Sequence, residues 1–149
     1  MQNPTRTTTS SYPDLPQVAV GAIVFKNSKV LLVLRANPPS EKMWSIPGGR
    51  VELGETLQEA AEREIKEETG ITIRAKEPVF TFEVIDRDAA GRVRFHYVII
   101  DLAADYLSGE PYAGDDAVDT DWISAEDLKG LAVSPTTLEV LKQLFKFGI

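Results

Sequence analysis

The sequence lacks cysteine and contains a single histidine, His96. The absence of cysteine excludes disulfides, thiolate zinc sites and cysteine nucleophiles, and it is compatible with a reducing cytoplasm, where we expect the protein to act. One histidine cannot form a two-histidine metal site, and a serine triad would depend on His96 alone as its base. Any catalytic chemistry therefore has to come from other side chains.

Long apolar runs and an excess of basic residues are also missing. No segment approaches the ~20 apolar residues that a transmembrane helix needs. The chain has 16 Lys and Arg against 23 Asp and Glu, a formal net charge of -7. A large nucleic-acid surface would need clustered basic residues, so we predict neither a DNA partner nor a membrane partner. A polyanionic ligand would have to be attracted by something other than the net charge of the protein, which is negative.

The length of 149 residues suits one domain. Residues 1–16 are polar and rich in Thr, Ser and Pro, without the apolar core of a secretory signal, and are predicted to form a flexible leader. Residues 17–149 are predicted to form the single domain.

Segments rich in Val, Ile, Phe and Tyr predict the strands. Residues 17–35 are typical of a β-hairpin that turns at Asn27 and Ser28. A second hairpin is expected from the extended segments 71–74, 78–88 and 92–104, and shorter strands are expected at 44–46 and 119–124.

Capping residues predict three helices. Thr56 and Glu59 form a capping box, and Gly70 suits the left-handed residue after the helix they begin. Ser124 caps a short helix. A closing helix starts after Ser134, with Pro135 at its first position and Leu138, Leu141, Leu144 and Phe145 on one face.

The helix from 56 to 69 is unusually acidic. At about 100° per residue its apolar stripe consists of Leu57, Ala60, Ala61 and Ile65. Glu64 and Glu68 fall inside this stripe. The opposite arc allows favourable pairs four residues apart, Glu59 with Arg63 and Glu62 with Lys66.

Glu64 and Glu68 repel each other in the last two turns, where the helix dipole already disfavours anions. In a partly apolar setting each needs a proton or a cation. A divalent metal ion would relieve all of these penalties, and oxygen donors without His or Cys select Mg²⁺ or Mn²⁺. A purely structural role is the alternative.

The same segment carries a known pattern. Gly49, five residues, Glu55, seven residues, then Arg63-Glu64-Ile65-Lys66-Glu67-Glu68-Thr69-Gly70-Ile71 resembles the Nudix box at all nine of its fixed positions. This resemblance implies an α+β fold, the Nudix α/β/α sandwich with a mixed β-sheet, over about residues 17–147.

Nudix enzymes hydrolyse nucleoside diphosphates linked to another moiety and use a divalent metal ion. The resemblance implies that Glu64 and Glu68 are metal ligands and that Glu67 is a further ligand or the base that activates water. The Gly48 carbonyl is an expected extra ligand. Gly49, Glu55, Arg63 and Gly70 match positions that brace the box loop, which for Arg63 competes with its pairing to Glu59.

Further candidates lie outside the box. Asp115 and Asp116 precede Trp122, and Asp116 is our choice as general base or additional ligand, with an acidic solvent loop as the alternative. Arg35 and Arg50 are candidate substrate contacts, although exposed arginines are common. Trp44, Phe25 and Tyr97 could stack on a base or belong to the core.

Residues 82–124 resemble the ADP-ribose pyrophosphatase branch of the family. The expected reaction is hydrolysis of ADP-ribose, a small-molecule nucleotide, to AMP and ribose 5-phosphate. A MutT-like nucleoside triphosphate pyrophosphatase and a dinucleoside polyphosphate hydrolase are alternatives. A non-catalytic nucleotide-sensing module is the alternative of another class, and the intact box favours catalysis over it. A homodimer is possible, as in similar proteins.

Overall fold

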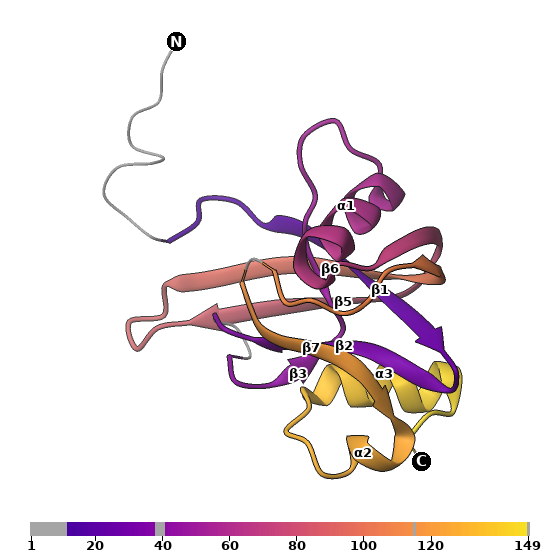
Figure 1. Ribbon diagram of the computed structural model, residues 1–149. Helices are drawn as coiled ribbons and strands as arrows, with labels where there is room; N and C mark the ends of the chain where they lie inside the picture. Colours follow the sequence, from indigo (N-terminus) through magenta and orange to yellow (C-terminus); the bar gives the residue numbers. More distant parts are fainter. Residues whose placement is uncertain (1–11, 38–40, 115, 149) are drawn as a thin grey trace.

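The computed structural model describes residues 12–37, 41–114 and 116–148 (Figure 1). The strands are β1 (Gln17–Lys26), β2 (Lys29–Arg35), β3 (Trp44–Ser45), β4 (Gly48–Arg50), β5 (Thr72–Arg87), β6 (Val93–Ser108) and β7 (Ala117–Ser124). The helices are α1 (Leu57–Thr69), α2 (Ala125–Leu128) and α3 (Pro135–Phe145).

The sheet is mixed. Its main path runs β3-β2-β1-β6-β5, with β4 paired to β1 and β7 paired to β2. The β1–β6 pair is parallel and the other pairs are antiparallel. β1 and β2 form the predicted hairpin, and its two turn residues, Asn27 and Ser28, both have positive φ. This left-handed pair matches the twist of a two-residue hairpin turn.

Two hydrophobic cores lie on opposite faces of the sheet. Alternate residues of β1 face opposite ways, so Val20, Ala22 and Val24 pack with α1 while Ile23 packs with α3. Figure 1 shows α1 on one side of the strands and α2 with α3 on the other. The predicted α+β class and the three-layer α/β/α sandwich are confirmed.

Helix α1 forms where its caps predict it. The Thr56 side chain accepts a hydrogen bond from the Glu59 amide, and the Glu59 carboxylate accepts one from the Thr56 amide. Gly70 ends the helix at φ 77° and donates its N–H to the Lys66 carbonyl. Such caps satisfy backbone groups that a helix end leaves without partners, typically stabilising it by about 1 kcal/mol each.

The second hairpin is longer and more continuous than predicted. β5 is one bulged strand of 16 residues in place of two separate segments, and its register shifts around Pro78. Proline has no amide hydrogen for the ladder, which explains an irregularity at this point. Figure 1 shows β5 and β6 extending well beyond the helices on one side.

Helix α3 starts at Pro135 after its Ser134 cap, as predicted, but its buried face differs from the expected one. The fully buried side chains are Val140 and Leu141, whereas Leu144 is exposed. The sequence of a short amphipathic helix does not fix which of its faces packs on the sheet. Here the face centred on Leu141 is the one that packs.

Residues 1–11 of the predicted leader lie outside the described residues. Near its end, Tyr12 donates a hydrogen bond to Asp88 at the tip of the second hairpin, 2.9 Å away. No helix among the described residues is long and apolar enough to cross a membrane.

Candidate active site

A cavity of about 470 Å³ opens between the end of α1, the β1–β4 pair and the start of α3. This volume is within the usual range for a small-molecule site. Its wall includes seven of the residues predicted from the sequence, namely Arg35, Gly48, Gly49, Arg50, Glu64, Glu68 and Asp116. The fold thus gathers residues from both sides of the box and from the distant loop before β7.

Glu64 packs directly against the backbone of Gly49. A Cβ atom built on Gly49 would overlap the Glu64 carboxylate, with Oε2 only 2.6 Å away. A glycine is therefore needed here for the carboxylate to reach the cavity wall. Burial raises the pKa of Glu64 against the opposing effect of its hydrogen bond from Arg63.

Glu68 is the most buried carboxylate of α1, with 5% of its surface exposed. Its Oε1 accepts a hydrogen bond from the Gly48 amide at 3.0 Å. Burial nevertheless raises the pKa of Glu68 to about 7, and the negative charges of Glu64 and Asp116 contribute in the same direction. The hydrogen bond and the nearby Arg35 charge offset this only in part. A bound cation would favour the ionised form.

Arg63 connects the box loop to the helix. Its Nε and Nη2 donate to the two carboxylate oxygens of Glu55 at 2.6 and 2.8 Å, and Nη2 also donates to the Arg50 carbonyl at 3.0 Å. Of the two partners considered for Arg63, the structure selects Glu55, because Glu59 is engaged in the capping box. The pKa of Glu55 is lowered to about 2 by its hydrogen bond from Arg63.

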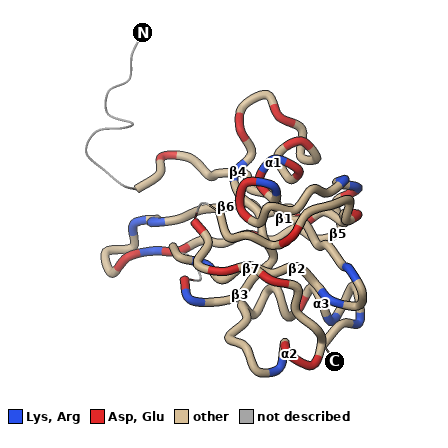
Figure 2. The backbone as a smooth tube through the Cα atoms, viewed as in Figure 1, with Lys and Arg blue, Asp and Glu red and all other residues tan. Residues whose placement is uncertain are grey.

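The other residues of the box helix and its cap lie away from the cavity wall. Glu67 is 44% exposed, accepts a hydrogen bond from Arg63 at 3.1 Å and does not line the cavity. Glu62 accepts a hydrogen bond from the Ala75 amide on the far side of the helix. Gly70 serves as the helix cap and faces the loop at Glu110. Figure 2 shows acidic residues along α1 and the loop before it.

Among the candidates outside the box, some line the cavity and others do not. Asp116 has φ 63° and accepts a hydrogen bond from the Asn37 amide group at 3.1 Å on the cavity wall. Its neighbour Asp115 lies outside the described residues. Tyr97 lines the cavity, whereas Phe25 packs on Phe145 in the core.

The donor set fits a hard divalent cation. Among the described residues no group of three Asp, Glu, His or Cys side chains lies close enough together to hold a metal ion. Mg²⁺ does not require such a group, since it is commonly held by one or two carboxylates together with water and substrate phosphates. Glu64 and Glu68, with carbonyl oxygens such as that of Gly48, would supply this kind of partial shell.

The cavity also contains polar residues that were not anticipated from the sequence. Asp101 on β6 is buried, with 3% of its surface exposed, and Ser45 on β3 is buried as well. Asp101 did give a signal, since it is the one carboxylate within the apolar run from Tyr97 to Ala104. Strand alternation from Tyr97 and Ile99 places it on the same face. Ser45 gave no comparable signal.

Comparison with known proteins agrees with this architecture. The NUDIX domain model matches residues 15–144. The chain is 41% identical to the ADP-ribose pyrophosphatase of Methanocaldococcus jannaschii over 117 residues, which cover 78% of this chain and 67% of that protein. It is 29% identical to the 8-oxo-dGTP diphosphatase of Escherichia coli over 129 residues, covering 86% and 95% of the two chains.

A solved structure shows that the similarity to Nudix hydrolases extends to the fold. The MutT NUDIX hydrolase from Burkholderia pseudomallei superposes with a TM-score of 0.69 and 30% identity, covering 88% of this chain and 99% of that one. The family match extends over most of the chain and includes the box, whose Gly49, Glu64 and Glu68 line the cavity described above. This protein belongs to the Nudix hydrolase family.

Proposed function

We propose that the protein hydrolyses the pyrophosphate bond of ADP-ribose, giving AMP and ribose 5-phosphate, with Mg²⁺ or Mn²⁺ as cofactor. The observation that supports this most is the placement of Glu64 and Glu68 on the wall of one cavity, with Glu68 buried at the end of α1. Two neighbouring carboxylates at a helix C-terminus are costly unless a cation binds them.

The metal ion would lower the pKa of the attacking water and neutralise charge on the departing phosphate. Water adds to one phosphorus, the bridging P–O bond breaks, and the bridging oxygen leaves with the other phosphate. Asp116 would accept the proton of the water. This role is supported by its position on the cavity wall beside Asn37, whereas Glu67, the other candidate, is held by Arg63 outside the wall.

Arg35 and Arg50 would contact the substrate phosphates. Both line the cavity, and the charge of Arg35 already acts on Glu68. These local positive charges, together with a bound metal ion, explain how an acidic protein can bind a polyanion. Glu55, Arg63 and Gly49 would act indirectly, by holding the box loop and the Glu64 carboxylate in place.

The choice of ADP-ribose rests on the 41% identity to the Methanocaldococcus jannaschii enzyme. A MutT-like activity on nucleoside triphosphates is the second candidate, because the match to the Escherichia coli diphosphatase spans 86% of this chain. Either reaction places the metal ion and the water at the same carboxylates. Action in the cytoplasm and assembly as a homodimer stay predictions.

A substrate panel separates these possibilities. Purified protein is incubated with Mg²⁺ or Mn²⁺ and ADP-ribose, NADH, nucleoside triphosphates or dinucleoside polyphosphates, and the products are identified by mass spectrometry. The proposal expects AMP and ribose 5-phosphate from ADP-ribose. Nucleoside monophosphate and pyrophosphate from triphosphates would select the MutT-like reaction. Binding of nucleotides without any cleavage would show a sensing module.

A further inference from the structure

Asp101 and Ser45 are buried residues of the cavity wall. Among the described residues, the Ser45 hydroxyl is buried without a hydrogen-bond partner. Burial alone raises the pKa of the Asp101 carboxyl group, and no donor among these residues offsets it. Buried polar groups in folded proteins are nearly always hydrogen-bonded, and leaving one unsatisfied typically costs about 1–3 kcal/mol. A ligand bound in this cavity would supply hydrogen-bond partners to both groups.

The Asp101 carboxyl group is directed across β1 toward the box. A Cβ atom built on Gly21 would overlap Oδ1 of Asp101, and it would lie 3.3 Å from the Pro47 carbonyl oxygen. Gly21 is paired with Asp101 on one side and with Gly48 on the other. Two strand spacings therefore separate the backbones of Asp101 and Gly48, roughly 10 Å. This distance suits a nucleoside whose phosphates lie at the box.

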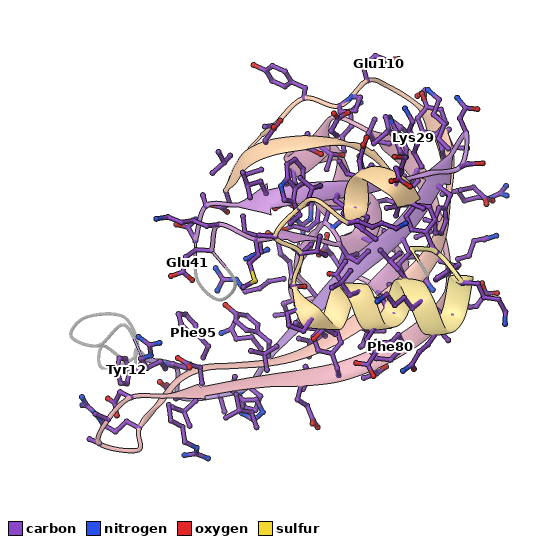
Figure 3. The ribbon with its side chains drawn as sticks, turned by 90° about the horizontal axis from the view of Figure 1, so that it is seen from below. Tyr12, Lys29, Glu41, Phe80, Phe95 and Glu110 are labelled. Atoms are coloured by element: carbon purple, nitrogen blue, oxygen red, sulfur yellow. The ribbon has the colours of Figure 1, made fainter. Side chains whose placement is uncertain are left out.

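An apolar strip continues from Asp101 along the second hairpin. Tyr97 and Ile99 precede it at alternate positions of β6 and therefore share its face of the sheet. Val84 and Phe82 lie opposite them on β5, and all four side chains line the cavity. Phe80, the cross-strand partner of Asp101, lies where the hairpin passes α3 (Figure 3). The strip offers a flat apolar surface that ends at a carboxyl group.

We propose that Asp101, assisted by Ser45, determines specificity by accepting a hydrogen bond from the amino group of a nucleobase that lies on this strip. The inference deepens the proposed function, since it concerns the nucleoside part of the same substrate. An ionised carboxylate can only accept hydrogen bonds, so it favours adenine, which has an amino group, over hypoxanthine, which has an oxygen at that position. Burial raises the pKa of Asp101 to about 7, and at pH 8 the acceptor form predominates.

The test compares matched substrates that differ at this group. Initial rates are measured at pH 8 for ADP-ribose against IDP-ribose and for ATP against ITP, in the wild type and in Asp101→Asn. We expect the wild type to prefer the amino-bearing substrate. Asparagine also offers a donor, so the variant should lose about 10- to 100-fold in kcat/KM for ADP-ribose, mainly through KM, and gain on IDP-ribose.

Controls separate recognition from folding. Asp105→Asn makes the same chemical change on the same strand, at a half-buried residue that is paired with Arg74 and does not line the cavity, and should leave the substrate ratio unchanged. Ser45→Ala should shift the ratio in the same direction as Asp101→Asn but by less, and it replaces that variant as the test if Asp101→Asn does not fold.

Two results would overturn the inference. An unchanged adenine-to-hypoxanthine ratio in Asp101→Asn would show that this carboxyl group does not contact the base. A parallel loss on both substrates would indicate contact with the ribose or a structural role. In either case hydrolysis by the wild type would leave the proposed function standing, whereas a wild type that cleaves none of the four substrates would count against the proposed function itself.

Discussion

The two ends of the cavity treat their polar groups in opposite ways. At the box, Arg63 bonds to Glu55, Glu64 and Glu67, and the Gly48 amide bonds to Glu68. At the other end, called the strand end here because Asp101 on β6 and Ser45 on β3 form it, the Ser45 hydroxyl has no hydrogen-bond partner among the described residues. No donor among these residues offsets the effect of burial on the pKa of Asp101. The box is thus organised by the protein itself, whereas the strand end offers polar groups that are open to a ligand.

This difference suits two separate tasks, catalysis at the box and recognition of the substrate at the strand end. A reaction that depends on metal geometry needs carboxylates whose positions are fixed before substrate arrives. Recognition of a base instead gains from buried groups that remain unpaired with the wrong partner. Substitutions at the box should therefore lower turnover for every substrate, and substitutions at the strand end should change the ranking of substrates.

The largest effect is expected for Glu68→Gln. Glutamine keeps the shape and the acceptor for the Gly48 amide but removes the charge that would hold the metal ion. Turnover of the best substrate should fall by roughly 10²–10³-fold, as for loss of one electrostatic group in an active site. Glu62→Gln, on the same helix but outside the cavity wall, is the matched control and should retain turnover. Near-normal turnover in Glu68→Gln would contradict the prediction that substitutions at the box lower turnover for every substrate.

The next effect is expected for Arg63→Lys. Lysine cannot form the paired hydrogen bonds that Arg63 makes with Glu55, so the loop and Glu64 lose their fixed positions. Groups that orient metal ligands typically contribute 10- to 100-fold to affinity or activity. Steady-state rates at rising Mg²⁺ should show a weaker apparent metal affinity. Arg74→Lys, at an exposed ion pair, should leave it unchanged.

A smaller effect is expected for Gly49→Ala. The new methyl group would displace the Glu64 carboxylate, which is the end of a flexible side chain, so the fold should survive. Turnover should fall roughly tenfold while the melting temperature stays close to that of the wild type, because a displaced ligand affects chemistry more than packing. Gly130→Ala, where the nearest atom to an added Cβ is the Asp127 carbonyl oxygen at 3.8 Å, is the control. Unchanged turnover would show that Glu64 does not need this position.

The smallest effect concerns stability and pH at the strand end. Burial raises the pKa of Asp101 from 3.8 to about 7, so the folded state holds its proton more tightly than the unfolded state. The resulting stabilisation is present below pH 4 and is lost as pH rises to about 7. Asp101→Asn should remove this loss, so its metal-free melting temperature should fall by fewer degrees between pH 5 and pH 8. An identical fall in both proteins would contradict the burial of an ionisable group at Asp101.

The sequence predicts the box end well because its signals are local. The capping box at Thr56, the cap at Gly70 and the spacing of Glu64 and Glu68 each depend on residues within one helix. The cavity wall at Asp101 depends on which strands become neighbours. Gly21 lies beside Asp101 only because β1 pairs in parallel with β6, and this pairing joins segments about eighty residues apart. The buried face of α3 is missed for the same reason, since packing against the sheet selects it.

Binding of Mn²⁺ measured by electron paramagnetic resonance tests most directly whether Glu64 and Glu68 hold a divalent cation together. The wild type should bind Mn²⁺, Glu64→Gln and Glu68→Gln should each bind it much more weakly, and Glu62→Gln should match the wild type. Equal binding in all four proteins would contradict the assignment of this glutamate pair as the metal site.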